Sequence, residues 1–218
     1  MQKKIFFAFF LLTLSSFFWS GNFFTGKLAF NNELNPFKLS FFRWVLAFMI
    51  LIPFTFKDIL RNFNIFKENI LLILILSLLG VTIFNSFTYI SLQTTLVINA
   101  SLMTSITPLL IIGFSWLIFK TKTNFFQFLG IFLSLLGVFN IVLKGNINNL
   151  YNLYFTPGDL WMFIAVFSWG LYSVLLKKVD VRLSQLATLE VMIFIGLIFI
   201  FPFYVIESLN NSFFPNNN

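Results

Sequence analysis

The chain alternates between long apolar runs and short polar segments. Seven runs are long enough to cross the roughly 30 Å of hydrocarbon in a bilayer, at about 5–28, 37–56, 70–91, 95–118, 125–143, 160–176 and 185–206. A helix can span a bilayer because it satisfies its backbone hydrogen bonds within one segment. The first run resembles a signal peptide, but it continues through Phe24 without a small-residue cleavage site. The pattern predicts an all-α integral membrane protein with seven spanning helices.

The first span has a second copy about 150 residues later in the chain. The aligned residues are Phe17, Trp19 and Lys27 with Phe167, Trp169 and Lys177, and, one residue out of step, Pro53 and Phe54 with Pro202 and Phe203. Five spans separate the starts of the two copies, so the second copy enters the membrane from the opposite side. Inverted repeats of this kind are typical of secondary transporters. We therefore predict a first five-helix repeat at 1–145 and the first two helices of a second repeat at 157–218.

Composition excludes several classes of protein. The chain is 59% apolar and 10% charged, whereas about a quarter of the residues in a soluble domain are charged. The net charge of +7 comes from residues in short loops between apolar runs, so it does not indicate a nucleic-acid partner. The chain has no Cys and no His, which removes thiolate ligands and the commonest metal ligand and proton shuttle. We expect no metal site and no cofactor.

Lysine and arginine indicate the orientation of the chain in the membrane. With the N-terminus inside, the cytoplasmic segments hold Lys3, Lys4, Lys57, Arg61, Lys67, Lys120, Lys122, Lys177, Lys178 and Arg182, and the outer segments hold Lys27, Lys38 and Lys144. This bias follows the positive-inside rule and predicts a cytoplasmic N-terminus. The polar, Asn-rich tail after the last span would lie outside, and it resembles a loop between helices.

Several motifs occur in the order typical of one family. They are WSGNFFTGK at 19–27, NPFKLSFFR at 35–43, TLVINASLMTSITPLL at 95–110, the pair Gly130 and Gly137, and GDLWMFIAVFSWGLYSVLLKK at 158–178. With these motifs, nearly the whole chain resembles the EamA branch of the drug/metabolite transporter superfamily. The family commonly has a Glu just after the fourth helix, where this chain has Phe119, Lys120, Thr121 and Lys122, so no role of that Glu carries over.

The resemblance implies ten helices in two inverted five-helix halves, of which seven are present here and the second half is incomplete. It also implies a multi-pass protein of the bacterial inner (plasma) membrane that exports small metabolites, amino-acid-like compounds or drugs by alternating access. The expected partners are membrane lipid and a small-molecule substrate. Gly130, Ser134 and Gly137 form a small-residue stripe that fits close helix packing within the chain or a homodimer.

Polar and aromatic side chains recur on one face of four spans, where they would face the bundle interior. The predicted substrate pathway consists of Trp19, Asn22, Asn85, Asn99, Thr107, Trp169 and Tyr172. These side chains offer hydrogen bonds and aromatic walls but few charges, which suits zwitterionic or amphipathic molecules. The alternative interpretation is that they form hydrogen bonds between helices.

Two charges lie well inside predicted spans. Arg43 follows Pro36 by seven residues, about 10 Å along a helix, and is predicted to anchor to helix ends, to snorkel outward or to bind an anionic substrate group. Glu190 lies at a comparable depth from the opposite face, as a proton-coupling carboxylate or a snorkelling residue. The two are predicted to belong to different sites. Pro108 would kink the fourth span, either as part of a gate or as a tolerated membrane proline.

Other functional classes fit the sequence less well. A retinal protein needs a Lys in the last span, and the run 185–206 contains none. Intramembrane metalloproteases and Ser–His hydrolases need His, which the chain lacks. An aspartyl dyad needs two acids inside the membrane, and Glu190 is the one acid well inside a predicted span. We therefore expect no enzymatic activity. The alternatives to a carrier that remain are a truncated membrane protein without transport activity and a seven-helix receptor.

Overall fold

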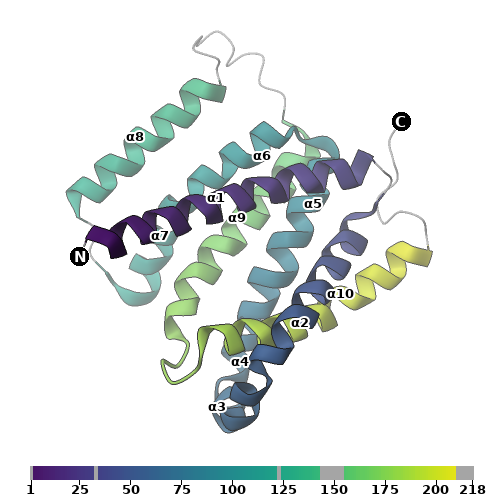
Figure 1. Ribbon diagram of the computed structural model, residues 1–218. Helices are drawn as coiled ribbons and strands as arrows, with labels where there is room; N and C mark the ends of the chain where they lie inside the picture. The colour runs from purple at the N-terminus through teal and green to yellow at the C-terminus, as the bar shows by residue number, and fades with distance from the viewer. Residues whose placement is uncertain (1, 32–33, 122–123, 143–154, 210–218) are drawn as a thin grey trace.

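The computed structural model describes residues 2–31, 34–121, 124–142 and 155–209, and its regular elements are helices (Figure 1). Six segments are long and apolar enough to cross a membrane: Ile5–Asn31, Pro36–Arg61, Ile70–Thr94, Val97–Phe119, Pro157–Lys178 and Gln185–Leu209. The apolar helix Phe125–Gly137 is shorter than these six. The all-α membrane class predicted from the sequence is confirmed. Lys122, Lys144, the repeat boundary at 145 and the tail 210–218 lie outside the described residues.

The uninterrupted helices are α1 (Gln2–Asn31), α2 (Pro36–Arg61), α8 (Phe125–Val142), α9 (Pro157–Leu175) and α10 (Gln185–Leu209). A short helix, α3 (Phe63–Glu68), follows α2, and a 3₁₀ turn, η4 (Leu176–Lys178), follows α9. The apolar pattern did not predict α3, which lies between two spans and buries Phe66.

The third and fourth spans each change helix type along their length. The third span runs through α4 (Ile70–Leu76), the π-helix η1 (Ser77–Ile83) and α5 (Phe84–Thr94). The fourth runs through α6 (Val97–Met103), the 3₁₀ turn η2 (Thr104–Ile106) and α7 (Thr107–Phe119). Pro108 lies in the first turn of α7. Because its ring would clash with the carbonyl of Thr104, four residues earlier, a regular α-helix cannot pass through this point unchanged.

Helices that the sequence predicts to be equivalent meet in two places, and one pair, α2 and α10, is antiparallel. Along α2 and α10, Phe37 stacks on Phe203 with ring centroids 5.1 Å apart, whereas Phe48 meets Phe194 at 5.9 Å. Residue numbers therefore rise along α2 while they fall along α10. Trp19 of α1 meets its equivalent, Trp169 of α9, edge to face at 5.6 Å. These contacts bring helices of both predicted copies together.

Helix α8 lies at the edge of the bundle (Figure 1). An added Cβ at Gly130 or Gly137 would have no atom of the described residues within 4 Å. The small-residue stripe predicted on this helix therefore has no packing partner in the part of the chain that the structure describes. A homodimer through this helix stays a prediction.

A buried carboxylate ties the end of α10 to the start of α2. Glu207 is 1% exposed, and its Oε2 accepts the backbone N–H of Lys38 at 2.9 Å. The N-cap residue of α2, Asn35, makes no side-chain cap hydrogen bond. Glu207 therefore supplies from another helix the cap and the negative charge that favour a helix N-terminus.

We expect Glu207→Ala to destabilise the protein by about 1 kcal/mol, because the first turn of α2 loses its acceptor. Glu207→Gln should recover part of this loss, since an amide oxygen still accepts the bond. Thermal unfolding in detergent would measure both variants. The matched control is Glu68→Ala at the exposed end of α3, which should leave the midpoint unchanged. Equal midpoints for Glu207→Ala and Glu68→Ala would contradict the capping role.

Candidate functional site

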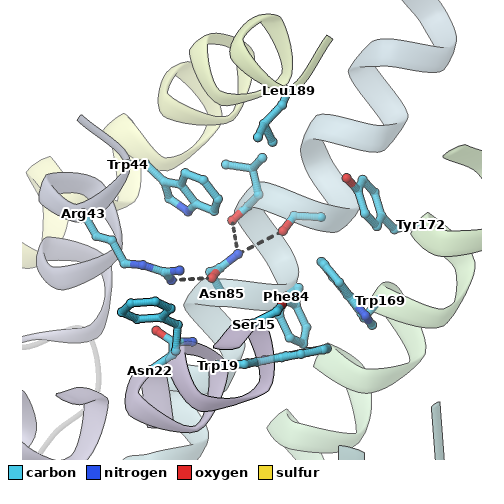
Figure 2. Close-up of a pocket in the computed structure, with 13 residues that line it drawn as sticks. Ser15, Trp19, Asn22, Arg43, Trp44, Phe84, Asn85, Trp169, Tyr172 and Leu189 are labelled. Carbon is cyan, nitrogen blue, oxygen red and sulfur yellow. Dashed lines mark hydrogen bonds between the residues drawn. The ribbon is translucent and has the colours of Figure 1, made fainter. Parts of the chain in front are cut away.

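A cavity of about 390 Å³ lies where helices of both copies meet (Figure 2). It is lined by Ser15, Phe18, Trp19, Asn22, Arg43, Trp44, Gly80, Val81, Phe84, Asn85, Trp169, Tyr172 and Leu189. These residues come from α1, α2, η1, α5, α9 and α10. The volume is within the range of sites for small organic ligands.

A chain of hydrogen bonds forms the polar wall of this cavity. Arg43 donates through Nη1 to Asn85 Oδ1 and to the Tyr89 hydroxyl, each at 2.7 Å. The Tyr89 hydroxyl donates in turn to Asn22 Oδ1 at 2.7 Å. These bonds join α2, α5 and α1 around the cavity. The partners of Arg43 are neutral, so its positive charge is not cancelled by them.

The π-helix η1 brings backbone carbonyls to the same region. A π-helix is wider than an α-helix and commonly occurs at functional sites. Asn85 Nδ2 donates to the carbonyl of Gly80 at 2.9 Å, and Ser168 Oγ donates to the carbonyl of Leu79 at 2.7 Å. Because side chains satisfy these carbonyls, the irregular segment has hydrogen-bond partners inside the bundle. Asn85 therefore supports both Arg43 and the backbone of η1.

Aromatic rings form the opposite wall. The ring of Trp169 lies 4.5 Å from that of Phe84 and is stacked on Tyr172 at 5.0 Å, measured between centroids. The ring of Tyr172 also lies directly against Gly80, where an added Cβ would be only 2.6 Å from it. Glycine at position 80 therefore allows the third span to approach the aromatic wall closely.

A second cavity of about 450 Å³ lies on another side of the tryptophan pair. Trp19 and Trp169 line it together with Ser101, Thr104, Thr107 and Pro108, among others. The two indoles thus border both cavities. Thr107 and Pro108 lie beside the point where the fourth span changes helix type.

The predicted pathway residues fall into three groups. Trp19, Asn22, Asn85, Trp169 and Tyr172 line the first cavity, and Thr107 lines the second. Asn99, in contrast, is exposed on α6 and lines neither of these cavities.

Arg43 lines the first cavity, whereas Glu190 does not. Glu190 is 1% exposed, and neither carboxyl oxygen has a hydrogen-bond partner among the described residues. No ion pair joins Arg43 and Glu190 among the described residues. The ion pair found there is between Arg182 and Asp180. The pKa of Asp180, in the exposed connection between α9 and α10, is lowered to about 2 by hydrogen bonds from Arg182.

Tyr89 is the main site residue that the sequence analysis missed. It follows Asn85 by four residues, so it lies on the same face of α5, and this spacing was an available signal. Trp44 and Gly80 were missed as well, and their place in the cavity depends on the packing of α2 and η1. The described residues contain no group of three or more acidic, His or Cys side chains that could hold a metal ion.

Comparisons with known proteins identify the family of the chain. The model of the EamA-like transporter family matches residues 6–143 and 156–217. An "Uncharacterized transporter" of Archaeoglobus fulgidus is 29% identical over 203 residues, which cover 92% of this chain and 68% of the relative. "Uncharacterized transporter YyaM" of Bacillus subtilis is 28% identical over 132 residues, which cover 61% of this chain and 43% of the relative.

A third relative is an "Uncharacterized transporter" of Methanothermobacter thermautotrophicus, which is 32% identical over 112 residues, or 51% of this chain and 33% of the relative. The alignments to the second and third relatives thus take in less than half of those proteins' own length. No solved structure matches the chain. Since the family model matches both copies, separated by only a short gap, the chain belongs to the EamA-like transporter family.

Proposed function

We propose that the first cavity is the substrate-binding site of a carrier that exports small organic molecules by alternating access. The observation that carries this proposal is that helices from both predicted copies line the cavity, with Trp19 and Trp169 in contact. Carriers built from inverted repeats bind their substrates at the repeat interface and move one repeat against the other. The family supports membrane transport, and substrate, direction and mechanism are part of the proposal.

The two cavities and the irregular helices suggest how access alternates. Trp19 and Trp169 lie between the cavities, so a shift of this pair would connect or separate them. The π-helix η1 and the 3₁₀ turn before Pro108 lie beside the first and second cavity respectively. Interruptions of this kind are frequent at hinges. In this proposal the protein resides in the bacterial inner membrane with a cytoplasmic N-terminus, and Pro108 marks a moving segment.

Matched Asn substitutions test the cavity. Asn85→Leu removes bonds to Arg43 and Gly80, so we expect export to fall to the level of cells without the protein. Asn99→Leu changes an exposed position outside both cavities and should leave export unchanged. Mass spectrometry of the medium, at equal amounts of membrane-inserted protein, would measure which small compounds accumulate. The proposal fails if no compound distinguishes wild type from the empty vector, or if Asn85→Leu exports like wild type.

Glu190 is the proposed proton-coupling group. An ionised carboxylate is costly where no hydrogen bond or cation compensates it, so we propose that Glu190 exchanges its proton when water reaches it in another conformation. Export by wild type should fall several-fold when a protonophore collapses the proton gradient. Glu190→Gln should export slowly and without response to the protonophore, while Glu68→Gln should behave as wild type. A Glu190→Gln variant with full protonophore sensitivity would show that coupling uses another group.

A further inference from the structure

Arg43 lines the first cavity, and part of the hydrogen-bonding capacity of its guanidinium is unused. Its two hydrogen bonds, to Asn85 and Tyr89, both come from Nη1. Nε and Nη2 donate to no other described residue. An arginine side chain carries five N–H donors in a planar fork that matches a carboxylate with two parallel bonds. The Nε and Nη2 edge is therefore free for such a pair.

The position of Arg43 makes its charge unusual. It lies seven residues into α2, about 10 Å from the helix start at Pro36. An arginine at this depth could extend toward the membrane surface. Here two bonds of 2.7 Å to α5 hold the guanidinium against the bundle instead. The ring of Trp44 lies 5.2 Å from Cζ, and an aromatic face is a weak partner for a cation compared with an anion.

No acid compensates this charge inside the cavity. The lining residues include no Asp or Glu. Asp159 lies at the start of α9, where its carboxylate accepts hydrogen bonds from Thr95 and Thr156. A ligand ammonium group would therefore meet a like charge at Arg43 and find no carboxylate in the lining. An anionic group would meet the free edge of the guanidinium.

The rest of the cavity suits an apolar body. Phe18, Trp19, Phe84 and Trp169 present rings to it, and aromatic faces bury large apolar area. We propose that this cavity selects organic monoanions over zwitterions, neutral molecules and cations, with a carboxylate on the Nε and Nη2 edge of Arg43 and an apolar body against the tryptophan pair. This inference rests on the proposed function of the cavity as a substrate site.

The test compares four probes that each carry a phenyl ring on a short alkyl chain. Tryptophan fluorescence of the full chain in phosphatidylcholine nanodiscs would report binding of 4-phenylbutyrate, 4-phenylbutanamide, 4-phenylbutylamine and phenylalanine. We expect 4-phenylbutyrate to bind about tenfold more tightly than the amide, because a charge-assisted pair replaces a neutral one. The amine and phenylalanine should bind no better than the amide. Equal affinities for the anion and the amide, or no binding of the anion, would overturn the proposal.

Two variants separate charge from shape. Arg43→Gln should reduce the anion preference to less than about twofold, whereas Arg61→Gln, at the exposed end of α2, should keep it. Asn85→Asp places a carboxylate against Arg43 at nearly the same size, and it should also remove the preference. This second variant matters because Arg43→Gln could fail to fold. An unchanged preference in a folded Asn85→Asp protein would overturn the assignment.

The anion could also come from a lipid headgroup, which shares the same oxygen chemistry. Nanodiscs that contain phosphatidylglycerol distinguish the two sources. Unchanged affinity for 4-phenylbutyrate in them supports a site for a free organic anion, and loss of binding assigns the site to lipid and overturns the proposal. If the anion preference is absent while Asn85-dependent export persists, only this inference fails. If that export is absent, the proposed function of the cavity fails as well.

Discussion

Trp169→Ala is expected to lower export by more than tenfold, to the level of cells without the protein. Trp169 contacts Trp19, Phe84 and Tyr172 through its ring, and it borders both cavities. Removing the indole is expected to join the two cavities and to take away part of the apolar surface for a ligand. A carrier that cannot close one side of its site leaks its substrate or fails to bind it, so the effect should exceed that of a single lost hydrogen bond.

The control for this variant is Trp116→Ala. Trp116 is 55% exposed on α7 and does not line either cavity, so export should persist. Because partly buried Trp169 packs against the core and contributes to stability as well, Trp169→Phe is a second test that keeps a ring in place. We expect Trp169→Phe to fold like wild type and to show intermediate export. Full export by Trp169→Ala at normal membrane levels would contradict the assignment of the aromatic wall.

Gly196→Ala is expected to destabilise the protein by about 1–3 kcal/mol through overpacking. A Cβ at position 196 would lie 2.3 Å from Cγ1 and 2.7 Å from Cβ of Val81. Since the Cβ atom of Val81 is attached directly to the backbone, a rotamer change cannot relieve both contacts. The backbone of η1 would have to move away from α10, and Thr82 would lose its 3.4 Å contact with the carbonyl of Gly196.

Helix propensity acts in the opposite direction here. Alanine in place of glycine favours a helix interior by about 1 kcal/mol, so a lower unfolding midpoint requires a larger steric cost. Gly113→Ala isolates the propensity effect, because a Cβ there has no atom of the described residues within 4 Å. We expect the thermal unfolding midpoint of Gly113→Ala in detergent to equal or exceed that of wild type. If Gly196→Ala also raises the midpoint, the close contact between η1 and α10 is not present in the folded protein.

The sequence by itself determined the membrane class and the approximate span positions, and it predicted the equivalence of Trp19 with Trp169. Runs of apolar residues are set by the thickness of the bilayer, so they can be read without knowledge of the packing. Span ends were less predictable. The last predicted span stopped at 206, whereas α10 continues to Leu209 and thereby places Glu207 at the start of α2.

Only the tertiary structure decided which polar side chains meet. Asn85 and Asn99 both occupied polar stripes in the sequence, yet Asn85 lines the first cavity and Asn99 is exposed. The π-helix η1 was equally hidden in the sequence, and one of its carbonyls, that of Leu79, accepts a hydrogen bond from Ser168 of the distant helix α9. Helical periodicity gives the face of one helix. Which other helix packs against that face depends on contacts between residues distant in the chain, such as those of Arg43 with Asn85 and Tyr89.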